Sequence, residues 1–206
     1  MYQPRAFVGT DLEQLDALFA ADPFVTLVSQ DESGAPFASH LPVLYQRNSD
    51  GIRIEGHWAR PNPQASHAGD ALMIVHGPHA YVSPGWYPDK LSASRVPTWN
   101  YAIAHLRGRL QPFEDEVPLT DLVSRLSSRF EATVGGDWDF EAGDARQRAL
   151  LRGIIGFHFV PEQVDIKLKL SQNHPLANRQ AVITALSDRD DAEARAVADL
   201  MRTTLP

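Results

Sequence analysis

Short β-forming runs separated by turn signals fill the first two-thirds of the chain and constrain its fold most. Residues 24–28 and 37–45 flank a polar turn at 31–34, so they predict a hairpin. A third strand is expected from Ile52, and the apolar run 71–75 is typical of a strand covered on both faces. About six or seven such strands predict a closed antiparallel barrel, mainly β with peripheral helices, and not a doubly wound sheet.

The later part of the chain adds both strands and helices. Residues 77–83 begin as an alternating strand, 98–110 form a long one, and 154–160 return to strand. Residues 164–171 alternate strictly, which buries Ile166, Leu168 and Leu170 and places Lys167, Lys169 and Ser171 on the opposite face. Helical spacing predicts helices at 118–132 and 144–151, and two more that close the chain, the last opening near Ser187. We expect one domain, 1–206, with a helical C-terminal extension from about 174.

Composition narrows the possible functions. With 206 residues and 43% hydrophobic residues the chain is long enough for one well-buried domain. A net charge of −7 argues against a broad contact with nucleic acid or anionic lipid, so direct DNA binding is not supported. The N-terminus has no secretion-signal pattern and no apolar run would span a membrane. We therefore expect a cytoplasmic protein with no membrane contact.

Several kinds of chemistry lack their sequence signals. The chain has no cysteine, which excludes disulfides and thiolate ligands, and its eight histidines show no metal-ligand spacing, so no metal site is predicted. A GxSxG nucleophile elbow and a glycine-rich dinucleotide loop are both missing. No catalytic residue can be assigned.

The segment 54–64 contains a candidate anion site. Asn62 is a good N-cap residue and Pro63 suits the first position of a helix, so a strand is expected to run directly into a helix here. The free amides of the first helical turn, with Arg60 beside them, would then attract a phosphate group. The alternative is an ordinary capped helix with a solvated arginine.

A second cationic feature is the face that carries Lys167, Lys169 and Ser171. It is either a solvated sheet edge or, with the amides of Gln172 and Asn173, part of a binding site. Four aromatic residues flank the proline-rich loop before Pro97 and are either core or ligand wall; they are Trp86, Tyr87, Trp99 and Tyr101. A phosphate site, flat aromatic surfaces and amides together suit flavin mononucleotide, FMN.

Four segments carry a resemblance to a known family. In order along the chain they are EGHWARPNPQ (55–64), GPHAYVSPGWYP (77–88), VPTWNY (96–101) and KLKLSQN (167–173). They resemble the signature blocks of the PaiB-type FMN-binding negative transcriptional regulators, and the likeness extends nearly to Ala185. The resemblance implies a split β-barrel of the FMN-binding type, related to flavin reductases and pyridoxine phosphate oxidases. It also implies a homodimer with FMN at the subunit interface.

The resemblance also implies a set of cofactor-binding residues. His57, Arg60, Asn62 and Gln64 match the polar run that leads to the phosphate, and Ser39 and His40 match the strand beside the flavin. The positions expected near the cofactor or the subunit contact are Asn100, Tyr101, Lys169, Ser171 and Gln172. The implied function is an FMN-binding regulator whose output follows flavin occupancy or redox state. The alternative is an FMN-dependent oxidoreductase that uses NAD(P)H, since the flavin itself supplies such chemistry.

Overall fold

The computed structural model describes all residues, 1–206, and divides the chain into two compact units. The first unit comprises Met1–Ala21, His76–His105 and Asp165–Pro206. The second unit comprises Asp22–Val75 and Leu106–Val164. Three long strands run through both units: β6 (Gly69–Val82), β7 (Thr98–Phe113) and β8 (Ile154–Lys169).

The remaining elements belong to one unit each. The first unit contains η1 (Arg5–Phe7), β1 (Val8–Gly9), α1 (Leu12–Ala21), η3 (Pro84–Trp86), α4 (Leu176–Ser187) and α5 (Ala192–Thr203). The second unit contains β2 (Phe24–Gln30), β3 (Pro36–Pro42), β4 (Leu44–Asn48), β5 (Gly51–Ala59), η2 (Pro63–Ser66), α2 (Glu116–Val134), α3 (Ala145–Leu150) and η4 (Leu151–Gly153).

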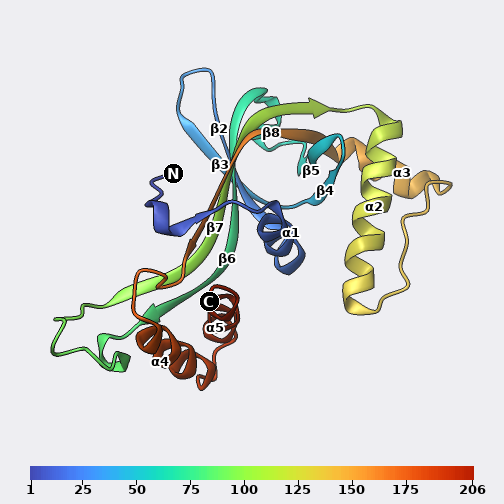
Figure 1. Cartoon of the computed structure of the whole chain (residues 1–206). Helices are drawn as coiled ribbons and strands as arrows, with labels where there is room; N and C mark the ends of the chain where they lie inside the picture. Colours follow the sequence, from blue (N-terminus) through green and yellow to red (C-terminus); the bar gives the residue numbers. More distant parts are fainter. The chain divides into compact units, whose positions relative to one another are not determined.

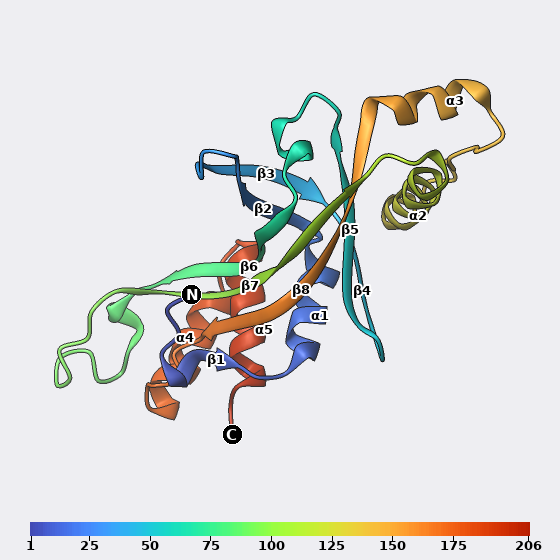
Figure 2. The same ribbon diagram turned by 90° about the horizontal axis from the view of Figure 1, so that it is seen from above.

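The eight strands form one hydrogen-bonded sheet in the order β3-β2-β6-β7-β8-β5-β4, and β1 pairs with β8. The pairings β2–β3, β2–β6, β4–β5, β5–β8 and β1–β8 are all antiparallel. Figure 2 shows β4 beside β5, and β1 beside β8. The predicted mainly β architecture with peripheral helices is confirmed.

The predicted hairpin is present as β2 and β3, with Thr26 opposite His40. Two predictions of separate strands were wrong. Residues 71–75 and 77–82 lie in the single strand β6, and residues 154–160 and 164–169 lie in the single strand β8. Glycine and proline at these points resemble turn signals. The two predicted strands of β8 were separated around Pro161. The structure keeps β8 continuous there, because Gly108 of β7 has no side chain and the backbone of Val160 and Pro161 lies close against it.

Helix boundaries follow their capping residues. α5 begins at Ala192, where Asp191 Oδ1 accepts hydrogen bonds from the amides of Glu193 (3.1 Å) and Ala194 (3.3 Å). The prediction that this helix opens near Ser187 was wrong, since Ser187 is the last residue of α4. α2 ends at Gly135, whose φ of 69° is the left-handed conformation that glycine adopts readily.

Each unit has its own apolar core. In the second unit Trp58 is buried against Phe157, with ring centroids 4.6 Å apart, and Leu122 and Leu126 of α2 pack on Leu44. In the first unit α4 and α5 lie side by side (Figure 1). Their buried apolar residues, with those of α1, are Leu15, Leu18, Phe19, Val182, Ile183, Leu186, Val197 and Met201. No helix of the chain combines the length and apolarity that crossing a lipid bilayer requires.

We predict that Gly108→Ala destabilises the protein by about 1–3 kcal/mol, the usual cost of overpacking. A Cβ atom at this position would lie 2.1 Å from the carbonyl oxygen of Val160, and backbone cannot rotate away as a flexible side chain can. Chemical denaturation of both proteins measures the difference. The control is Gly143→Ala, whose Cβ would meet nothing within 4 Å, and equal losses in the two variants would contradict the prediction.

Candidate functional site

The eleven residues predicted to bind a cofactor fall into two clusters, one in each unit. The second unit holds Ser39, His40, His57, Arg60, Asn62 and Gln64. The first unit holds Asn100, Tyr101, Lys169, Ser171 and Gln172. Each cluster is described in turn.

Asn62 links the turn after β5 to β3. Its Oδ1 accepts a hydrogen bond from the amide of Gln64 (2.9 Å) and its Nδ2 donates to Ser39 Oγ (3.0 Å). The predicted N-cap at Asn62 and the proline at the first helical position are confirmed. The helix itself is a single 3₁₀ turn, Pro63–Ser66, whose amides at Gln64, Ala65 and His67 are already hydrogen-bonded.

Arg60 does not lie over the amides of this turn, so the predicted anion seat is not formed within one chain. Its Nε donates to the carbonyl of Arg152 (2.6 Å), its Nη2 to that of Ile154 (3.2 Å), and its Nη1 to Glu114 Oε2 (2.5 Å). The backbone amide of Arg60 also donates to Gly153 O (2.7 Å), which extends the β5–β8 pairing and carries the side chain with it. The ion pair with Glu114 is solvent-exposed.

Gln64 was predicted as a cofactor ligand, and the structure shows a structural role. Its side chain is fully buried, and Oε1 accepts a hydrogen bond from the Trp58 indole (3.0 Å). Nε2 donates to the carbonyl of Leu27 (3.0 Å) and to Ser29 Oγ (3.0 Å), with a longer bond to Phe37 O (3.2 Å). Protein atoms therefore use both N–H donors of the amide and one of the two lone pairs of Oε1.

The two histidines of the second unit's cluster differ in their environment. His40 is exposed, and its Nδ1 lies 3.0 Å from Thr26 Oγ1 on the neighbouring strand. His57 is half-buried, its Nδ1 is buried without a hydrogen-bond partner, and burial lowers its pKa. A neutral imidazole with an unused ring nitrogen is able to donate or accept a hydrogen bond, depending on its tautomer.

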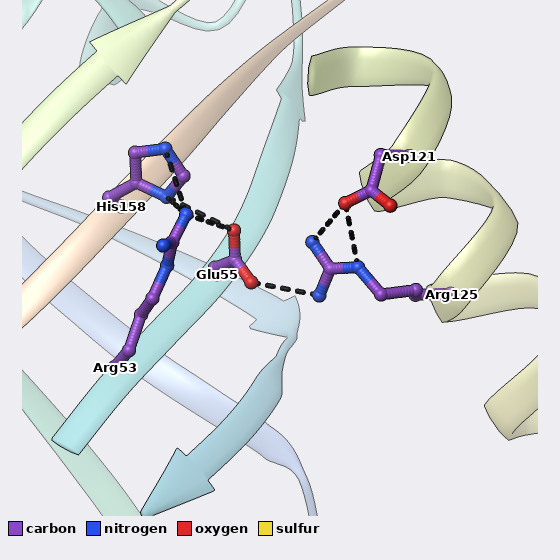
Figure 3. A network of polar contacts seen from close by, with 5 residues as sticks. All are labelled: Arg53, Glu55, Asp121, Arg125 and His158. Atoms are coloured by element: carbon purple, nitrogen blue, oxygen red, sulfur yellow. Dashed lines mark hydrogen bonds and ion pairs between the residues drawn. The ribbon is translucent and has the colours of Figure 1, made fainter. Parts of the chain in front are cut away.

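The sequence analysis missed the buried carboxylate of Glu55, two residues before His57 on the same face of β5. Figure 3 shows Glu55 between Arg53 and Arg125, with His158 beside it and Asp121 on the far side of Arg125. Arg53 Nη2 donates to Oε1 (2.9 Å), Arg125 Nη1 donates to Oε2 (2.8 Å), and His158 Nδ1 lies 3.1 Å from Oε1. The network joins β5, β8 and α2.

The charges around Glu55 control its ionisation. Burial alone would raise the pKa of the carboxyl group. The hydrogen bond and charge of Arg125, with the charges of Arg53 and His158, outweigh burial and hold the pKa below its ordinary value of 4.5. Glu55 is therefore ionised at neutral pH and pairs α2 with the sheet.

The first unit's cluster is built at the end of β8. Asn100 is fully buried, and its Nδ2 donates to Ser171 Oγ (3.0 Å) and contacts Met201 Sδ (3.3 Å). Gln172 closes on its own backbone, since its Oε1 accepts from the amide of Leu170 (2.8 Å) and its Nε2 donates to Leu168 O (2.6 Å). One N–H of Nε2 and one lone pair of Oε1 stay available, so its predicted contact with a cofactor stays a prediction.

The lysine face of β8 is not a solvated edge. Lys167 is buried, its Nζ donates to the carbonyl of Tyr2 (3.0 Å), and the atom lies 5.3 Å from the centroid of the Tyr101 ring. Lys169 Nζ lies 5.9 Å from the same centroid and donates to Trp99 O (2.5 Å) and to Thr98 Oγ1. The pairing of β1 with β8 covers this end of the strand, which strict alternation could not reveal.

Residues 1–163 match a protein family described as "Putative FMN-binding domain". The chain belongs to this FMN-binding family. Over 211 residues it is 33% identical to Protease synthase and sporulation protein PAI 2 of Bacillus subtilis, which covers 100% of this chain and 98% of that protein. An uncharacterized protein of Emericella nidulans is 26% identical over 202 residues, 80% of each chain. The predicted membership of the PaiB-type FMN-binding family is confirmed.

Solved structures of low sequence identity resemble this chain in fold. The FAD and heme binding protein from Mycobacterium smegmatis matches with a TM-score of 0.56 and 16% identity, over 79% of this chain and 73% of that chain. The flavocytochrome Anf3 from Azotobacter vinelandii matches with a TM-score of 0.55 and 17% identity, over 79% and 69%. At such identities the likeness concerns the fold alone, and the predicted split β-barrel is confirmed.

We predict that Glu55→Gln lowers the free energy of unfolding at neutral pH by about 1.5–3 kcal/mol, the usual value of hydrogen bonds to a charged group. Because the folded-state pKa of Glu55 is depressed, its stabilisation is present above 4.5 and is lost as the pH falls through the lower folded value. Chemical denaturation at several pH values gives the free energy of unfolding of both proteins. As the pH falls through this range, that free energy should decrease more steeply in the wild type than in the variant.

The matched control for this prediction is Asp121→Asn, on the exposed side of Arg125. It should cost less than about 1 kcal/mol, because exposed ion pairs contribute little. Parallel pH profiles for the wild type and Glu55→Gln would contradict the assigned ionisation.

Proposed function

We propose that this chain acts as a homodimer that binds FMN where two copies meet, and that its output is regulatory and set by flavin occupancy or redox state. The observation that carries the proposal is the match of residues 1–163 to the FMN-binding family. When bound, FMN supplies electron-transfer chemistry. The chain has to hold the phosphate, offer polar atoms to the edge of the flavin ring and exclude water.

The second unit's cluster offers suitable atoms for this purpose. His57 Nδ1 is a buried polar atom with no partner, and such atoms are rare unless a ligand or water completes them. The Ser39 hydroxyl accepts a hydrogen bond from Asn62 and keeps its own hydrogen to donate. We assign these residues to the polar edge of the flavin site.

Arg60 fits the phosphate despite its present partners. Its charge is balanced by Glu114 alone, and both side chains are exposed, so water already competes for that pair. A phosphate dianion offers a stronger bidentate partner than an exposed carboxylate. The bonds from Nε and Nη2 to backbone carbonyls would hold the side chain in place while Nη1 exchanges partners.

A second copy of the chain would complete the site. Ligand sites bury most of the surface of a bound molecule, so a flavin ring needs walls on both faces. The main cavities of the chain each lie within one unit, and Ser39, His57 and Asn62 line none of them. If the partner subunit supplied the missing wall, Ser39, His57 and Asn62 would line an FMN site in the dimer although they line no main cavity of one chain.

The regulatory output is preferred over direct DNA contact, because the net charge of −7 gives no broad attraction for phosphates. The regulatory role is proposed from the resemblance to the PaiB-type regulators, and the relative from Bacillus subtilis, Protease synthase and sporulation protein PAI 2, aligns with the whole of this chain. The second candidate is an oxidoreductase that uses NAD(P)H.

A first experiment tests these functions together. The freshly purified protein should show a flavin absorption band and elute as a dimer in size-exclusion chromatography. Anaerobic mixing with NADH or NADPH separates the candidates: flavin that stays oxidised supports the regulator, and rapid bleaching supports the enzyme. Colourless protein with no affinity for added FMN would remove both.

We predict opposite effects from two variants at the phosphate. Arg60→Ala should weaken FMN binding about tenfold or more, since it removes a charged hydrogen bond. Glu114→Gln should tighten it severalfold, because the competing carboxylate loses its charge. Quenching of flavin fluorescence measures both affinities. Equal affinities in the wild type and both variants would exclude Arg60 from the phosphate site while leaving the family assignment intact.

A further inference from the structure

The first unit contains a cavity of about 370 Å³ between residues 93–97, the start of β7 and the end of β8. This volume is in the range of small-molecule sites. All of its lining residues belong to the first unit. The polar ones that matter here are Ser94, Thr98, Asn100, Lys169, Ser171 and His174.

Two cationic residues line the cavity: Arg95, which is paired with Asp89, and Lys169, which has no carboxylate among its bonded partners. Lys169 and its neighbour Lys167 are two of the three lysines of the chain, the third being Lys90. The partners of the two ammonium groups are carbonyl oxygens, a hydroxyl and aromatic rings, with no carboxylate among them. Burial, and then the charge of Lys167, lowers the pKa of Lys169. Half-buried, uncompensated charge of this kind is costly and is relieved by an anion.

Backbone strain is concentrated at the same cavity. Ser94 (φ 47°) and Ser171 (φ 62°) are the only non-glycine residues of the chain with positive φ, and both line it. Such conformations cost free energy and cluster at ligand sites. Ser171 is held there by the buried Asn100, whose Oδ1 accepts a hydrogen bond from Ser171 Oγ (3.1 Å). The hydrogen bond to a buried residue therefore holds Ser171 in its strained backbone conformation.

His174 adds a polar group that no protein atom uses. Its Nδ1 is buried without a hydrogen-bond partner, although the residue lines the cavity. The ring is stacked on Tyr87, with centroids 4.9 Å apart and planes 7° apart, so its orientation is fixed. A neutral imidazole carries one N–H donor, so the ring at the cavity wall is able to donate one hydrogen bond.

We propose that this cavity binds a small oxyanion group, phosphate or carboxylate, of an effector that is separate from the flavin. Lys169 supplies the charge, and His174 and the Thr98 hydroxyl supply further polar contacts. The site gives a regulatory protein a second input, and it stands whether or not the flavin proposal holds.

The first test uses inorganic phosphate as the probe and the intact wild-type chain. Lysine labelled with ¹³C at Cε gives one NMR signal for each of the three lysines. Phosphate should shift the Lys169 signal saturably and raise its pKa, leave Lys90 unchanged, and act with and without saturating FMN. Sodium chloride at equal ionic strength should not reproduce the shift. An absent or unsaturable shift would overturn the proposal.

The second test compares variants of equal charge change. Lys169→Gln should weaken phosphate binding about tenfold or more, since a charged hydrogen bond is lost, and Lys90→Gln on an exposed loop of the same unit should not. FMN affinity should be unchanged in Lys90→Gln. Competitive displacement of phosphate by FMN, but not by riboflavin, would show that the cavity receives the flavin's own phosphate and would overturn a separate effector. The wild-type NMR titration decides the matter if Lys169→Gln does not fold.

Discussion

The buried amide of Gln64 is the interaction on which the architecture of the second unit depends. One side chain takes the indole N–H of Trp58 and donates to β2 and β3, so it joins three strands and the turn that follows β5. An amide offers donors and an acceptor in a fixed plane, and an apolar replacement would leave buried groups unpaired. The positions of Asn62 and Ser39 follow from this amide, because both sit on segments that it ties together.

At the candidate flavin site some polar groups are bonded within the protein, and others have no protein partner. Gln64 and the cap at Asn62 shape the turn, whereas the Nδ1 atom of His57 and the hydrogen of the Ser39 hydroxyl are left to face a ligand. Arg60 lies between the two roles, with two bonds to backbone carbonyls and one to an exposed carboxylate. Few polar groups of this cluster are left free within one chain, in keeping with our proposal that two copies share the site.

The sequence predicted those parts of the structure that depend on local pattern. Alternation placed Ala80 and Val82 on one face of β6 and His79 and Tyr81 on the other, and the cap at Asn62 follows from residue type alone. It could not predict which side chains meet across the sheet. Arg60 binds the side chain of Glu114 and the carbonyl oxygen of Arg152. Glu55 binds Arg125 and His158. These partners are far apart in the sequence, so the contacts depend on strand register. For the same reason the sequence left open whether Lys167 lies on a solvated sheet edge or in a binding site, and the structure buries it next to β1.

The passage of β6, β7 and β8 through both compact units has a consequence for how the protein can be divided. A truncation that isolates either unit has to cut three strands in the middle and expose their backbone groups to any neighbouring chain. Neither unit is thus a module that recombination could transplant alone, and gene fusions should be made only at the chain termini.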